Sequence, residues 1–445
     1  MRKAIPFVLA VVLLLSLGAC GSEPPPETTA PAPSVTETEP VPGEGQVFRV
    51  YSWNEEFKLI FEKYYPVPEG ITVEWVIHPN EGGVYKSMLD EALKNQEQLP
   101  PEERIDLFLL EIDHDITRYT NSADTQDVKA LGVTDFSNAY PYTVQAATDE
   151  SGTIKGVSFQ CCPSALIYRR SIALEVLGTD DPDAVQEALS DWDKFAAVAA
   201  QAKEKGYYMT ASESETYRVF SNNASAPWVD DRGRLQFDSQ IRAWMDQAKR
   251  FSDLGYTINT GIWDEEKNDQ MFADGKTMCF FGPSWYFNFC MGNAQDPEKG
   301  CFGDWAICQG PQAHFWGGTW LMASAYTDNP TMLGDVLDTF LNDEDVCFAL
   351  VANEAQLSNN QAVNERFAAD PSYGNAFLGG QNDVAIFLEL AKDIQFRHHT
   401  GYDQTINESL QDCWREYCRG ELTEAEAMTR FYRMVTEQHP NIMIP

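Results

Sequence analysis

Apolar and polar positions follow two different periods in the first foldable part of the chain. Residues 47–53 and 71–78 are rich in β-branched and aromatic side chains, and residues 105–111 are almost wholly apolar. Between them, residues 55–65 and 82–98 carry apolar side chains at three- and four-residue intervals, which is the period of an amphipathic helix. Because the strands are apolar on both faces, this alternating order predicts an α/β fold with a parallel sheet covered by helices.

Polar and aromatic side chains follow each of these three strands. In open α/β sheets, ligands bind beyond the carboxyl ends of the strands. We therefore expect a cleft edge formed by the groups at those ends, namely Trp53, Asn54, Glu55, Glu81, Glu111 and Asp113.

The rest of the chain shows further helices and strands with clear boundaries. A Ser-x-x-Asp arrangement at Ser190 predicts the start of a helix that closes at Gly206, and a Thr-x-x-Glu capping box at Thr423 predicts a helix over 423–437. The other predicted elements are a turn between short strands over 228–238, a strand over 277–282 and a helix over 330–341. The sequence shows no internal repeat.

The N-terminal segment has the pattern of an export signal. An apolar run over residues 4–17 follows Arg2 and Lys3 and is too short to span a bilayer comfortably. Its end, Leu-Gly-Ala-Cys at 17–20, resembles the lipobox of bacterial lipoproteins. The resemblance implies that residues 1–19 are a signal peptide and that Cys20 is lipid-modified, which would anchor the protein at the outer face of the cell membrane of a Gram-positive-like bacterium.

Residues 20–45 have the composition of a disordered stalk behind the acylated cysteine. Residues 21–45 hold seven prolines and five glutamates, and their only larger apolar side chains are two valines. Such a segment cannot bury enough surface to offset the entropy of ordering. We expect it to hold the folded part away from the membrane.

Charge and cysteine content exclude several classes of function. A net charge of −36 argues against nucleic acid and against docking on anionic lipid, so contact with the membrane is expected through the lipid anchor only. Beyond Cys20, nine of the ten cysteines remain, without a zinc-binding spacing, so no metal or cofactor is predicted. They could form disulfides outside the cytoplasm or pack as small buried side chains.

No hydrolase or nucleotide-binding motif is present, and His398-His399 is interpreted as a polar surface pair rather than a metal site. A pair of carboxylates could hydrolyse a glycoside, but the sequence fixes no such pair. We expect a binding protein and not an enzyme.

Several phrases in a characteristic order resemble the carbohydrate-binding group (family 1) of extracellular solute-binding proteins of ABC transporters. These are "GVSFQCCPSALIYRRSIALEVLG" at 156–178 followed by "LSDWDKFAAVAAQAKEKG" at 189–206, then "MFADGKTMCFFGPSW" at 271–285, "WGGTWLMASAYTDNPTMLGDVLDTFLNDED" at 316–345 and "LSNNQAVNERF" at 357–367. The Cys161-Cys162 pair and the acidic, aromatic cleft edge depart from the general pattern of the family.

The resemblance implies a type II, two-lobe periplasmic-binding-protein-like fold with lobes joined by hinge strands. It assigns residues 46–155 and 315–360 to lobe 1 and residues 156–314 and 361–445 to lobe 2. It also implies a monomeric receptor that closes on a ligand and presents it to the permease subunits of an ABC importer.

A carbohydrate site needs aromatic rings for the C–H faces of the sugar and planar polar groups for its hydroxyls. Trp53, Trp285, Trp316 and Trp320 stand beside strand ends or glycine turns, and Tyr286 adjoins one of them. These aromatic residues and the cleft-edge residues named above are the predicted binding set. The alternative ligand is a polyamine or another cation, because "VYSWNEEF" at 50–57 resembles the first strand of polyamine-binding proteins and acids with tryptophan suit an ammonium group.

Overall fold

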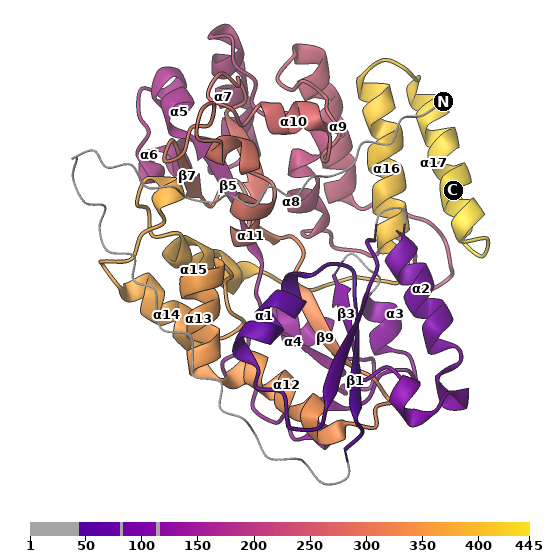
Figure 1. Cartoon of the computed structure of the whole chain (residues 1–445). Helices are drawn as coiled ribbons and strands as arrows, with labels where there is room; N and C mark the ends of the chain where they lie inside the picture. The colour runs from indigo at the N-terminus through magenta and orange to yellow at the C-terminus, as the bar shows by residue number, and fades with distance from the viewer. Residues whose placement is uncertain (1–43, 81–82, 113–115) are drawn as a thin grey trace, which may run out of the picture.

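The computed structural model describes residues 44–80, 83–112 and 116–445. Its two β-sheets form separate lobes, one above the other in Figure 1, and helices cover each sheet. Within the described residues, no helix is long and apolar enough to cross a bilayer.

The first sheet has five strands in the order β2-β1-β3-β9-β4. The strands are β1 (Val47–Ser52), β2 (Thr72–Ile77), β3 (Leu107–Glu111), β4 (Gly156–Ser158) and β9 (Thr319–Ala323). β1 pairs in parallel with β2 and β3, while β9 returns antiparallel between β3 and β4. The predicted parallel α/β arrangement of residues 47–111 is therefore confirmed.

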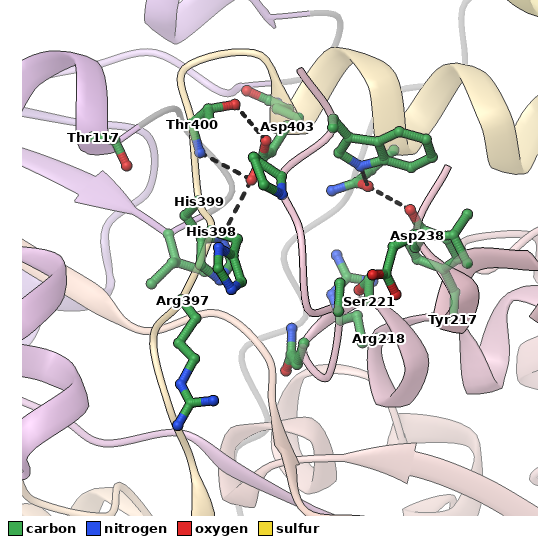
Figure 2. A pocket seen from close by; sticks show the side chains of 18 of the residues that line it. Thr117, Tyr217, Arg218, Ser221, Asp238, Arg397, His398, His399, Thr400 and Asp403 are labelled. Carbon is green, nitrogen blue, oxygen red and sulfur yellow. Dashed lines mark hydrogen bonds and ion pairs between the residues drawn. The ribbon is translucent and has the colours of Figure 1, made fainter. Parts of the chain in front are cut away.

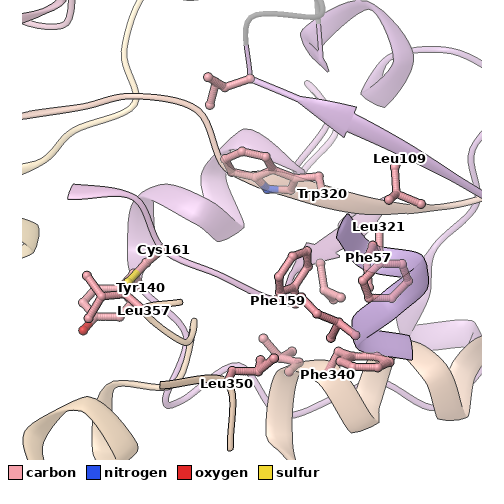
Figure 3. Close-up of a cluster of buried hydrophobic side chains, with 14 of the residues drawn as sticks. Phe57, Leu109, Tyr140, Phe159, Cys161, Trp320, Leu321, Phe340, Leu350 and Leu357 are labelled. Atoms are coloured by element: carbon pink, nitrogen blue, oxygen red, sulfur yellow. The ribbon is translucent and has the colours of Figure 1, made fainter. Parts of the chain in front are cut away.

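The first lobe is completed by helices on both sides of the sheet. They are α1 (Glu56–Tyr64), α2 (Val84–Leu93), α3 (Ile116–Thr120), α4 (Pro141–Ala146) and α12 (Pro330–Asn342), followed by α13 (Glu344–Glu354). Figure 3 shows how Phe57 of α1 and Phe340 of α12 meet Phe159 below the sheet. The ring centroid of Phe57 lies 4.9 Å from that of Phe340 and 5.3 Å from that of Phe159. The core of this lobe is therefore densely aromatic.

The second sheet has the order β6-β5-β7, with β8 also paired to β5. Its strands are β5 (Pro163–Arg169), β6 (Cys279–Gly282), β7 (Trp305–Cys308) and β8 (His314–Phe315). Helices around it are α5 (Arg170–Leu177), α6 (Pro182–Ala188), α7 (Trp192–Glu204), α8 (Tyr217–Ser221), α9 (Ser239–Leu254), α10 (Glu265–Asp269), α11 (Ser284–Phe289), α14 (Gln361–Ala369), α15 (Asp383–Asp393), α16 (Asp403–Cys418) and α17 (Glu424–Gln438).

Most predicted elements of the later chain are present, with two differences. The helix predicted from Ser190 is capped one residue later, because the Asp191 side chain accepts a hydrogen bond from the backbone N–H of Lys194. Over 228–238 the structure forms a single bridge between Val229 and Leu235 instead of two short strands. All nine cysteines of the described residues are free thiols, and most of them are buried, so they pack as small side chains.

Candidate functional site

Three chain segments cross between the two sheets side by side. The backbone N–H of Cys161 donates to Leu357 O at 2.9 Å, and that of Asn359 donates to Phe159 O at 3.1 Å. The N–H of Trp316 donates to Cys162 O at 3.2 Å. The connections from β4 to β5, from β8 to β9 and from α13 to α14 therefore form one hydrogen-bonded hinge between the lobes. β4 belongs to the first sheet, so the first crossing lies just beyond residue 158.

Two glycines allow the lobes to meet closely at this hinge. Gly317 and Gly318 have φ angles of +70° and +110°, which side-chain-bearing residues rarely adopt. A Cβ atom on Gly317 would lie 3.0 Å from Oε1 of Glu111 and 3.3 Å from Cζ2 of Trp285. Glu111 ends β3 of the first lobe and Trp285 belongs to α11 of the second, so this backbone turn brings a carboxylate and an indole together from the two lobes.

Four aromatic side chains form a continuous row on the second lobe and the hinge, which we call the aromatic row: Trp263, Trp316, Trp285 and Phe289. Successive ring centroids along the row are 5.6, 5.3 and 6.1 Å apart. The indole N–H of Trp285 donates to Trp316 O at 3.3 Å, which fixes α11 to the hinge. Trp316 is 5% exposed, Trp285 is half-buried, and Trp263 and Phe289 are 60% and 74% exposed.

A pocket between the lobes is lined in part by Trp316. Figure 2 shows Thr117 of the first lobe and Arg218 and His399 of the second around this pocket. Its walls come from the start of α3, from α8, from the hinge and from the segment that leads into α16; they include Thr117, Tyr217, Arg218, Ser221, Trp316, Gly317, Arg397, His398, His399, Thr400, Asp403 and Asn407. Its volume is about 80 Å³, whereas pockets for small ligands usually hold roughly 300–1,000 Å³. A sugar could therefore enter only if the lobes separate.

Most polar groups of this pocket are already held in place by local bonds. Asp403 accepts hydrogen bonds from the N–H and the hydroxyl of Thr400 at 3.1 and 2.6 Å, and its carboxylate lies 3.4 Å from Nδ1 of His399. Asn407 accepts hydrogen bonds from the hydroxyl of Tyr217 and from the indole N–H of Trp228. The guanidinium carbon of Arg218 lies 4.1 Å from the ring centroid of Trp316. The polar side chains on the second-lobe side of the pocket are therefore held in place by hydrogen bonds to one another.

Burial changes the ionisation of two groups near Glu111. Burial raises the pKa of Glu56 to about 7, although its carboxylate accepts a hydrogen bond from the Gln356 amide at 2.7 Å. Burial also raises the pKa of the Cys162 thiol, and the adjacent thiol of Cys161 and the carboxylates of Glu56 and Glu111 act in the same direction. The Cys162 thiol therefore stays protonated and serves as a packing group at the hinge.

The three predicted residues at the end of β1 have different surroundings in the structure. Trp53 is half-buried, and the centroid of its ring lies 6.0 Å from the ring centroid of Tyr85 in α2. Asn54 accepts a hydrogen bond from the N–H of Glu56 at 3.1 Å and so supports the start of α1. Glu55 is exposed. The predicted residues Glu81 and Asp113 lie outside the described residues.

Two predicted ligand-binding residues are buried in the core instead. Tyr286 is fully buried, and its hydroxyl contacts Nζ of Lys267, which lies 3.5 Å from the buried carboxylate of Glu215. Trp320 is 1% exposed, and its indole N–H donates to Thr143 O at 2.9 Å; Figure 3 shows it within the core of the first lobe. Both predictions are corrected for this conformation: Tyr286 lies on the buried face of α11, and β9 is a central strand whose residues are all buried.

Sequence reasoning missed Trp263, Phe289 and Arg218. Trp263 stands between Gly261, whose N–H donates to the Asp264 carboxylate at 2.6 Å, and the start of α10. Trp263 could have been predicted from its place in a glycine-containing loop, because the predicted tryptophans were chosen for similar positions beside glycine turns or strand ends. Phe289 follows Trp285 by one helical turn of α11, and this spacing also could have indicated it. No sequence feature marked Arg218.

The family of this chain follows from comparison with known proteins. A profile of the bacterial extracellular solute-binding protein family matches residues 89–374, which is more than half of the chain. This chain is a bacterial extracellular solute-binding protein. The predictions of a binding protein instead of an enzyme, and of a place of action outside the cytoplasm, are confirmed by this membership.

Solved structures of solute-binding proteins share the two-lobe fold. An extracellular solute-binding protein family 1 structure has a TM-score of 0.73 and 16% identity, covering 88% of this chain and 99% of that one. The galacto-N-biose-/lacto-N-biose I-binding protein from Bifidobacterium longum, in complex with lacto-N-biose, has a TM-score of 0.67 and 15% identity, with coverages of 90% and 98%.

A third solved structure, the ABC substrate-binding protein Lmo0181 from Listeria monocytogenes in complex with cycloalternan, has a TM-score of 0.63 and 13% identity, with coverages of 91% and 100%. No curated protein matches the sequence. The predicted two-lobe α/β fold is therefore confirmed, and the solute-binding protein is similar in architecture to carbohydrate receptors of ABC transporters.

Proposed function

We propose that this solute-binding protein captures a sugar or oligosaccharide between its lobes and delivers it to the permease of an ABC importer. The observation that carries the proposal is that Glu111 of the first lobe and Trp285 of the second both lie against Gly317. An indole can cover the C–H face of a sugar ring, and an adjacent carboxylate can accept two hydroxyl hydrogen bonds at once. Similar structures bound to lacto-N-biose, β-1,6-galactobiose and cycloalternan support the choice of ligand class.

Binding would be coupled to closure of the lobes. Glu111 lies on the first lobe and Trp285 on the second, so a ligand touches both only when the lobes are together. Such a ligand shifts the population toward the closed form, which would then dock on the permease. The three paired crossings at the hinge provide the axis for this movement.

Delivery at the cell surface is part of the same proposal. Acylation of Cys20 and a stalk behind it would hold a monomeric receptor close to the permease at the outer face of the membrane. The predicted end of the stalk at residue 45 is corrected, because the N–H of Gly45 donates to Asp328 O and Glu44 accepts from the N–H of Thr331. The lobe ranges 46–158 with 315–360 and 159–314 with 361–445 belong to the proposal; the predicted boundary after residue 155 is moved to 158 because β4 pairs within the first sheet.

The polyamine alternative is disfavoured by the contacts of Trp316. A polyamine site requires an aromatic face for the ammonium group. Here the guanidinium of Arg218 already lies over the Trp316 ring, 4.1 Å from its centroid, and would repel a second cation. The neutral hydroxyls of a sugar carry no such penalty.

The proposal is tested by calorimetric titration of the wild type and two variants with galacto- and malto-oligosaccharides. We expect Trp285→Ala and Glu111→Gln each to lower the affinity about tenfold or more, because stacking and a charge-assisted hydrogen bond are lost. Glu62→Gln changes an exposed carboxylate of α1 away from the hinge and is the matched control. Unchanged affinity in both cleft variants would place the ligand elsewhere.

A further inference from the structure

Two carboxylates are buried within one short turn of the second lobe. The 3₁₀ helix η5 (Glu213–Thr216) leads directly into α8, and the side chains of Glu213 and Glu215 are both fully buried. Taking a carboxylate out of water costs much free energy, and two like charges two residues apart repel each other. Such an arrangement needs a specific partner for each carboxylate.

Glu213 connects η5 to α16. Nε of Arg415 donates to its carboxylate at 2.8 Å, and the Arg415 side chain is mostly buried. The backbone oxygen of Glu213 accepts from the indole N–H of Trp244 in α9 at 3.1 Å. About two helical turns earlier on α16, Asn407 accepts from the hydroxyl of Tyr217 in α8. η5 and α8 are therefore bonded to α16 at two places.

Glu215 connects the same turn to α10, α11 and β6. Its carboxylate lies 3.5 Å from Nζ of Lys267 in α10, and this buried Nζ also contacts the hydroxyl of Tyr286 in α11. The Glu215 carboxylate accepts from the backbone N–H of Phe281 in β6 at 3.3 Å. Because Tyr286 adjoins Trp285, this network supports the helix that carries the cleft tryptophan.

Both ion pairs adjoin the elements that form the second-lobe wall of the interlobe pocket. α8 supplies Tyr217, Arg218 and Ser221 to this wall, as Figure 2 shows, and α16 supplies Asp403 and Asn407. Charge-assisted hydrogen bonds depend on direction, whereas apolar contacts do not. The two pairs therefore fix the position of α8 relative to α16 on one side and to α10 and α11 on the other.

Stability is a weak explanation for buried ion pairs of this kind. Replacing such a pair by apolar side chains of similar volume is often neutral or stabilising, because the charges no longer have to be desolvated. Fully bonded buried polar groups, in contrast, give their surroundings one defined arrangement. The pairs are therefore better suited to setting the position of neighbouring elements.

Building on the proposed function, we propose that Glu213 and Glu215 are positioning residues of the ligand site. They act through Arg415 and Lys267, which hold α8 and α11 where these helices contribute to the cleft. The ligand itself touches neither carboxylate.

The test separates ligand affinity from stability by removing a whole pair at once. The two variants are Glu215→Met with Lys267→Met, and Glu213→Met with Arg415→Met. We expect each to have a melting temperature close to that of the wild type. Each should bind galacto- or malto-oligosaccharides about two- to thirtyfold more weakly in calorimetric titration, and the α8 amides should exchange hydrogen faster.

Two further variants complete the test. Arg415→Lys keeps a cation for Glu213 and should retain more of the affinity than Arg415→Met. Arg169→Met is the matched control, because Arg169 is a buried cation of the same lobe at the end of β5 away from the hinge, 3.0 Å from Asp304. It should lower the melting temperature, since Asp304 and two backbone oxygens lose a donor, and leave the glycan affinity unchanged.

The possible failures are distinguishable. Unchanged affinity in both double variants, failure of both to fold, or an equal loss of affinity in the Arg169→Met control would overturn the positioning role while sugar binding stands. Absence of binding by any of these glycans to the wild type would overturn the proposed function and the inference with it.

Discussion

Glu56 occupies the first turn of α1, close to the hinge and to Cys162. Burial raises its pKa from 4.5 to about 7, while the hydrogen bond from Gln356 opposes this shift. The folded protein therefore holds a proton on this side chain more tightly than the unfolded chain does. Its contribution to stability is complete below the unfolded pKa and is lost as the pH rises through the folded pKa.

We predict that Glu56→Gln removes this pH dependence. Between pH 5 and pH 8 the wild type should lose about 2–3 kcal/mol of its free energy of unfolding through this group. The variant keeps the acceptor for Gln356 without the ionisation, so its stability relative to the wild type should rise over the same interval. Denaturant unfolding at both pH values measures the difference, with Glu62→Gln as a control that should follow the wild type.

Single residues also show where sequence reasoning reaches its limit. Glu111 and Trp285 were predicted because they stand at a strand end and beside a glycine, and the structure brings them together across Gly317. Tyr286 and Trp320 have similar surroundings in sequence, but Tyr286 lies on the buried face of α11, and Trp320 belongs to the central strand β9, which is buried on both faces. Sequence position beside a glycine or a strand end therefore does not decide whether a side chain is buried, because that depends on which face of the element packs against the rest of the fold.

Helix α17 is the clearest case of an element fixed by local sequence. The hydroxyl of Thr423 accepts from the N–H of Glu426 at 3.3 Å, and the Glu426 carboxylate accepts from the N–H of Thr423 at 2.8 Å. This is the predicted capping box. Phe431 and Val435 are fully buried on the inner face of the helix, as the apolar spacing indicates.

We predict that Thr423→Ala costs about 1 kcal/mol of stability, because backbone donors at the start of α17 lose a partner. Thr423→Ser keeps the hydroxyl and should lose only a small part of this amount. Denaturant unfolding measures both changes, and hydrogen exchange of the first amides of α17 locates them. Equal stability of the alanine variant and the wild type would show that the cap contributes nothing in this setting.

Other elements depended on contacts that local sequence does not contain. The helix α7 begins at Trp192 because Asp191 competes successfully with Ser190 for the capping role, and both residue types are good caps. The strand β9 lies between β3 and β4, more than 150 residues further along the chain. The resemblance to the solute-binding family assigned this segment to the first lobe, but its pairing was not predicted, since apolar strands do not specify distant partners by composition.

At the scale of the whole molecule, the hinge joins the two sheets, and the glycine turn lies within this hinge. Three crossings hold the lobes together, Gly317 lets Glu111 and Trp285 both approach the backbone turn, and the pocket beside Trp316 is too small to admit a sugar without opening. The family resemblance in the sequence predicted the two-lobe fold. It did not predict the order of the aromatic row, because that order arises only when the loop at Trp263, the hinge and α11 come together.

The most direct measurement of the central claim is thermal unfolding of the wild type against neutral oligosaccharides, spermidine and a peptide mixture. A ligand that binds only the folded protein raises the melting temperature by mass action. We expect a rise with one class of neutral oligosaccharide, no rise with spermidine, and complete recovery of the intact glycan by chromatography. A rise with spermidine alone, or loss of the glycan by hydrolysis, would contradict the account of a sugar receptor.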